Sequence, residues 1–68
     1  MGIDMYPTAA DMAEESRIKA KAFTRAAEDY AWDQDLVLAA RFERLARVHM
    51  AEAERYESLP ADEICPRF

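Results

Sequence analysis

Residues 13–30 read AEESRIKAKAFTRAAEDY, and residues 39–56 read AARFERLARVHMAEAERY. In both stretches small and large residues alternate at steps of three and four, which places them along one side of an α-helix. We call this set the seam. Its members are Ala13, Ser16, Ala20, Phe23, Ala27 and Tyr30 in the first stretch, and Ala39, Phe42, Ala46, His49, Ala53 and Tyr56 in the second.

The ends of both stretches carry helix-capping or helix-breaking residues. Thr8 and Asp11 have the spacing of a capping box, with Asp in place of the usual Glu. Asp33 is a good N-cap for the second stretch, and Pro60 lies beyond its end. These signals predict a first helix at the beginning of the chain and a second one from Asp33 onward.

The predicted helices cover about residues 9–31 and 34–58 of a single domain, 1–68, in which 1–7 and 60–68 are tails. One continuous helix is the alternative, because nothing between the two stretches is a strong breaker. However, the twelve residues from Ala27 to Ala39 would turn the seam by about 120°. A reversal at Asp33 instead lets both seams face each other, with Phe23 near Phe42. We therefore predict an all-α antiparallel hairpin.

A second apolar set lies beside the seam, and an isolated hairpin would leave it exposed. Each large side chain left uncovered forgoes roughly 1.5–3 kcal/mol. Two hairpins packed face to face would bury the set, so we expect a homodimeric four-helix bundle. The residues expected at this dimer or partner interface are Ile18, Ala22, Leu38, Leu45, Val48 and Trp32.

Composition limits the classes of function. The net charge of −5 disfavours general nucleic-acid binding, and the single cysteine, Cys65, excludes a disulfide within the chain. No stretch has the roughly 18–20 apolar residues of a membrane span, and the N-terminus lacks the pattern of a signal peptide. We expect a cytoplasmic protein without cofactor or metal.

A belt of basic residues in the middle of both helices supports an alternative function, RNA binding. Its candidate RNA contacts are Arg17, Lys21, Arg25, Arg41, Arg44 and Arg47. The hairpin with its alanine-rich seam resembles Rop, the RNA-binding hairpin dimer of plasmid copy control, and this resemblance implies an RNA-binding dimer. No RNA-contact residue of that family can be aligned with this chain. The simpler interpretation is a solvated face with helical ion pairs such as Glu15–Lys19.

Ser16 and His49 should face each other in the hairpin. We interpret them as a polar layer in which a hydrogen bond fixes the register. A nucleophile with its base would also need an oxyanion hole and a pocket, which two straight helices do not supply. A metal-binding bundle is a further alternative, because Glu52 follows His49 by one helical turn.

These observations favour a non-enzymatic protein that acts by protein–protein interaction. A short, acidic, helical chain without a catalytic constellation is typical of a small regulator or inhibitor, such as those encoded by phages or mobile elements. The expected partners are a second copy of the chain and another protein.

Overall fold

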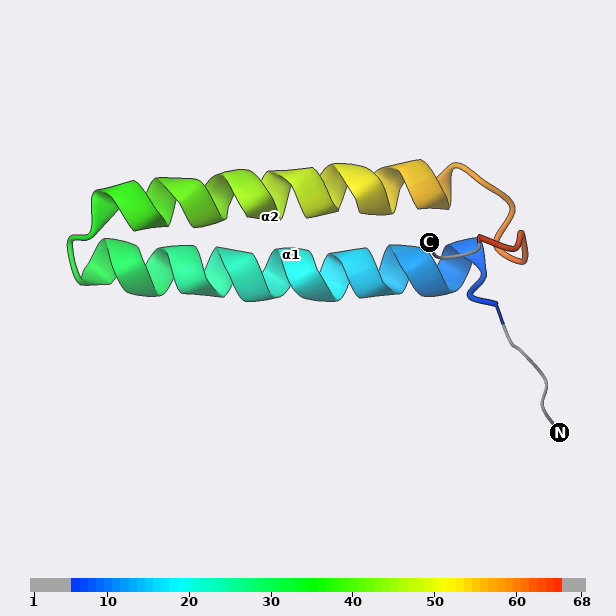
Figure 1. Cartoon of the computed structure of the whole chain (residues 1–68), viewed down its shortest axis with the longest axis horizontal. Helices are drawn as coiled ribbons and strands as arrows, with labels where there is room; N and C mark the ends of the chain where they lie inside the picture. Colours follow the sequence, from blue (N-terminus) through cyan, green and yellow to red (C-terminus); the bar gives the residue numbers. More distant parts are fainter. Residues whose placement is uncertain (1–5, 66–68) are drawn as a thin grey trace, which may run out of the picture.

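The computed structural model describes residues 6–65, which form two antiparallel helices lying side by side. The first, α1, spans Ala9–Trp32, and the second, α2, spans Leu36–Glu57. Figure 1 shows the tight turn at one end of the hairpin and the start of α1 and the end of α2 at the other. The all-α hairpin is thereby confirmed, and the observed helix ends differ from the predicted ones by no more than two residues.

The first turn of α1 has hydrogen-bond acceptors for its N–H groups from two parts of the chain. The predicted capping box is present: Asp11 N–H donates to Thr8 Oγ1 at 3.3 Å, and Thr8 N–H donates to Asp11 Oδ2 at 3.1 Å. Met12 N–H donates to the carbonyl of Thr8. The sequence pattern therefore located this helix start correctly, down to the residue types that cap it.

Residues 61–65, predicted as part of a tail, instead run back over the start of α1 (Figure 1). The N–H groups of Ala9 and Ala10 donate to the carbonyls of Glu63 and Ala61, at 2.7 and 3.1 Å. The N–H of Cys65 also donates to the carbonyl of Pro7. Because a helix leaves its first N–H groups without partners of its own, this segment completes the cap of α1. The predicted tail residues 1–5 and 66–68 lie outside the described residues.

The turn ends α1 with a Schellman motif. Asp35 N–H donates to Tyr30 O at 2.8 Å and Gln34 N–H donates to Ala31 O at 3.0 Å, the two hydrogen bonds that define this motif. Gln34, between them, has φ 63°, the left-handed conformation that glycine adopts without steric cost. The turn thus carries backbone strain at Gln34.

Asp35, and not Asp33, is the N-cap of α2. Its side chain accepts from the N–H of Leu38 at 3.3 Å, whereas Asp33 is the C-cap of α1. The prediction of Asp33 was wrong because both aspartates suit an N-cap and only the three-dimensional turn distinguishes them. α2 therefore begins two residues later than expected.

The core of the hairpin contains only small side chains. The buried residues are Ala9, Ala13, Ser16, Ala20, Ala27, Ala39, Ala46 and Ala53. No large side chain among the described residues is fully buried. Apart from Ala9, these are seam positions, so the predicted seam does form the contact between the helices. Its large members are only half-buried at the edge of this contact.

We expect Gln34→Gly to stabilise the hairpin by about 1 kcal/mol, because glycine removes the steric cost of a left-handed residue. For a domain of this size the melting temperature should rise by about 4–8 °C. Asp33→Gly is the matched control: Asp33 has φ −81°, so glycine there should lower stability. Thermal unfolding followed by circular dichroism measures both. Equal effects of the two changes would contradict the strain at Gln34.

Ala53→Leu should destabilise the hairpin by about 1–3 kcal/mol, because the added atoms have no space in a contact between helices. Ala53 is 0% exposed, whereas Ala51, two residues away on the same helix, is exposed. Ala51→Leu should therefore be nearly neutral. Urea unfolding of both variants tests this. An unchanged urea midpoint for Ala53→Leu would show that the two helices are not in close contact at Ala53.

Candidate functional site

The seam divides the hairpin surface into two unlike faces. A residue that follows a seam alanine and one that precedes it lie about 100° to either side of it. Those that follow are Glu14, Lys21, Glu28, Ala40, Arg47 and Glu54, and all are exposed. Those that precede are Met12, Lys19, Ala26, Leu38, Leu45 and Glu52, most of them half-buried. One face is therefore charged and the other is largely apolar.

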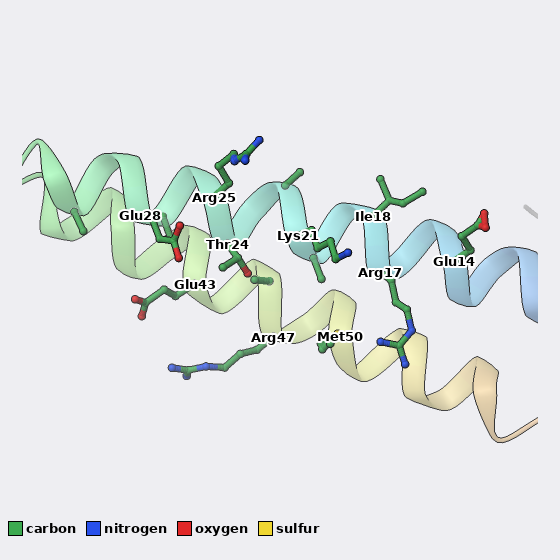
Figure 2. A pocket seen from close by; sticks show the side chains of 15 residues that line it. Glu14, Arg17, Ile18, Lys21, Thr24, Arg25, Glu28, Glu43, Arg47 and Met50 are labelled. Atoms are coloured by element: carbon green, nitrogen blue, oxygen red, sulfur yellow. The ribbon is translucent and has the colours of Figure 1, made fainter.

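The charged face contains an open groove of about 1060 Å³. Its floor includes the seam residues Ala20, Ala27 and Ala46, whose small side chains leave the space between the helices unfilled. Figure 2 shows charged side chains of both helices around it, with Arg17 reaching from α1 toward α2 and Arg25 pointing away from α2. The groove is a consequence of the same alanines that bring the helices together.

The structure distributes the predicted basic belt over several sides of the hairpin. Arg17, Lys21, Arg25 and Arg47 line the groove, together with Glu14, Glu28 and Glu43. Arg41 and Arg44 do not line it. The basic side chains of the groove thus alternate with acidic ones and do not form a continuous positive surface.

Arg17, one of the candidate RNA contacts, is engaged by a carboxylate of the other helix. Its Nε and Nη2 donate to the two carboxylate oxygens of Glu57 at 2.7 and 2.6 Å. Both side chains are nearly half exposed, so the pair contributes below about 1 kcal/mol. The expected helical pair Glu15–Lys19 is also present, at 3.3 Å. The pairing of Arg17 with Glu57 had no sequence signal, because the two residues are 40 positions apart.

The opposite side of the hairpin carries what we call the apolar face. Its apolar residues are Met12, Ala26, Leu38, Leu45 and Val48, and Lys19 and Glu52 lie on the same side. Leu45 and Val48 are 36% and 49% exposed, although each is a residue that favours burial. This face therefore presents apolar surface that the hairpin itself does not cover.

Four rings of the seam stack beside this face in a continuous series that alternates between the helices. Phe23 stacks with Phe42 at 5.8 Å between ring centroids and with His49 at 5.3 Å, and Tyr30 stacks with Phe42 at 5.4 Å. The predicted proximity of Phe23 and Phe42 is thus observed. The stack fixes how far the two helices are shifted along each other, and so determines which residues of α1 and α2 lie side by side around it.

The residues predicted for a dimer or partner interface do not all share one face. Leu38, Leu45 and Val48 lie on the apolar face, whereas Ile18 and Ala22 are among the residues that line the groove. Figure 2 shows Ile18, which is 61% exposed, pointing away from α2. Trp32, 88% exposed, lies at the turn end of α1. The heptad pattern identified apolar residues outside the seam but did not resolve which side each occupies.

His49 lies in the seam, but its hydrogen bond differs from the expected one. Its Nδ1–H donates to Glu52 Oε1 at 2.9 Å, because a carboxylate can only accept. No hydrogen bond joins it to Ser16 within the described chain. The His49–Glu52 pair is the contact that suggested a metal site, yet among residues 6–65 no three His, Cys, Asp or Glu side chains are grouped as metal ligands would be.

Comparison with known proteins returns no family model, no curated protein and no solved structure that matches this chain. The two faces are therefore interpreted from their own chemistry. In the described part of the chain, neither helix has the length and apolar character needed to cross a bilayer.

Phe42→Ala should destabilise the hairpin by about 2–4 kcal/mol, because Phe42 contacts a ring on each side in the stack. Phe42→Leu keeps most of the apolar volume and should cost about 1 kcal/mol. Chemical unfolding at one fixed protein concentration compares the two variants. A loss near zero for Phe42→Leu would mean that ring stacking does not contribute beyond apolar burial.

Proposed function

We propose that this protein acts without catalysis, by binding other protein surfaces through its apolar face. The observation that carries the proposal is the contrast between core and surface. The hairpin fully buries only small side chains, while Leu45 and Val48 remain partly exposed. A chain of this size gains little stability from its own core, so covering this face by association would stabilise it substantially.

The apolar face suits a protein partner better than the groove does. Its central residues, Leu45 and Val48, are aliphatic, and association of proteins is driven by removing such surface from water. The groove also exposes Ile18 and Met50, but next to its seam alanines it is lined by charged residues, which would lose hydration on contact with an apolar partner. A regulator or inhibitor that works by contact needs one such apolar face and no pocket.

The arrangement of charge gives RNA binding less support. Phosphate recognition depends on cationic groups available to several phosphates at once. In the groove, Glu28 and Glu43 separate the basic residues, and Arg17 is paired with Glu57. RNA binding is therefore the alternative function, and the following experiment distinguishes it from protein binding.

Affinity capture from a lysate of the source organism tests the function with three baits: wild type, Leu45→Glu and Arg47→Glu. The two variants introduce the same residue on opposite faces of α2. We expect the wild type and Arg47→Glu to retain the same proteins and Leu45→Glu to lose them, since a buried unpaired charge costs several kcal/mol. Nuclease treatment should leave the captured proteins unchanged.

The reverse pattern would overturn the proposal. Loss of the captured material with Arg47→Glu, together with sensitivity to nuclease, would assign the function to the groove and to RNA. Helical circular dichroism of both variants must be equal to that of the wild type, so that a loss of binding is not a loss of folding.

A further inference from the structure

We propose that a second copy of this chain covers the apolar face, with the two α2 helices packed antiparallel across a two-fold axis. This inference rests on the proposed function and names one partner for it. It is based on the order of the residues along α2 and on which residues of α1 lie beside the midpoint of α2.

A stripe of four residues runs along α2 at the apolar face. Arg41, Leu45, Val48 and Glu52 follow one another at steps of four, three and four, so they lie on one side of the helix. Two aliphatic side chains occupy the middle of this stripe, and a basic and an acidic residue occupy its ends. Such a stripe can pair with an antiparallel copy of itself.

The midpoint of α2 determines the register of that pairing. α2 spans Leu36–Glu57, so its midpoint lies between Ala46 and Arg47. Two antiparallel copies overlap over their whole length only when the two-fold axis passes through this midpoint. Residues equally far from the midpoint on either side then face each other, as in any two-fold interface.

The stripe is complementary to itself in this register. Arg41 and Glu52 are equally far from the midpoint, so each Arg41 faces Glu52 of the second copy. Leu45 faces Val48 in the same way, next to the axis. The register that gives full overlap therefore also forms two pairs of opposite charge around an apolar centre, an arrangement that favours the specific pairing.

The groove side of α2 lacks this property. Its corresponding stripe, at the same steps, is Glu43, Arg47, Met50 and Glu54. In the same register Glu43 would face Met50 and Glu54 would face Ala39, so no charged residue of this stripe would meet an opposite charge. Of these two stripes of α2, only the one on the apolar face forms pairs of opposite charge with a second copy.

The first helix leaves room for this packing. Phe23 stacks with both Phe42 and His49, which lie on either side of the α2 midpoint. Phe23 is therefore the residue of α1 that lies beside this midpoint. Ala26, less than one turn further on, adds only a methyl group to the apolar face. Lys19, on the other side of Phe23, is already paired with Glu15. No unpaired charge of these residues would be buried at the centre.

The size of the face is adequate for a stable dimer. A helix of 22 residues is about 33 Å long, and two adjacent helices are about 20 Å wide. Each copy would thus contribute roughly 650 Å², near the lower limit of about 1,200 Å² in total for stable interfaces. We expect dissociation at low protein concentration.

Sedimentation velocity of charge-swapped variants tests the register. In Arg41→Glu and in Glu52→Arg, like charges meet twice, so each variant should have a dimer dissociation constant raised at least about tenfold. An equimolar mixture of the two variants should regain wild-type dimerisation. In the mixed dimer, the two swapped side chains face each other and the two native ones do as well.

Arg47→Glu is the matched control, because Arg47 lines the groove on the side of α2 opposite to the stripe and is exposed. It should dimerise as the wild type does. Dimers that are unaffected by the swaps, or a mixture that stays monomeric, would overturn the register. A wild type that stays monomeric at high micromolar concentration would exclude the second copy. Capture that is lost with Leu45→Glu would still support the proposed function in that case, so the two failures are distinguishable.

Discussion

Close approach of two helices is possible only where the side chains between them are small, and the seam alanines impose this condition over most of the hairpin. The rest of the structure depends on it. Because the alanines fill little space, the large seam residues stack as rings at one edge of the contact. On the other edge nothing replaces them, which leaves the groove. The difference between the two faces therefore follows from the placement of small and large residues in a single heptad pattern.

Periodicity made the helices, their pairing and most of the core predictable. The repeat located Ala13, Ala20 and Ala27 in the contact, and the capping box located the start of α1. Structural features that do not repeat along the sequence were not predicted. The Schellman turn depends on a left-handed Gln34, and a glutamine gives no sequence signal for that conformation. The hydrogen bonds from Ala9 and Ala10 to residues 61–63 involve backbone groups, which every residue has.

The candidate surface was only partly predictable for a related reason. Apolar residues outside the seam can be recognised from the sequence, but their side of the hairpin depends on their angular position relative to the seam, which apolar character alone does not give. Ile18 and Leu45 illustrate this: both are apolar and outside the seam, yet Ile18 lines the groove and Leu45 lies opposite it. Spacing relative to the nearest seam alanine separates the two sides more reliably than apolar character does.

The segment that follows α2 determines when the first turn of α1 can be completed. The N–H groups of Ala9 and Ala10 have their acceptors in residues 61–63, which are synthesised only after both helices. Until residues 61–63 are in place, these two N–H groups have water as their acceptor. At the same end of the hairpin a single antiparallel bridge joins Ile64 to Thr8. The cap of the first helix is thus completed only by the segment that follows the second helix, so the two ends of the hairpin's sequence depend on each other.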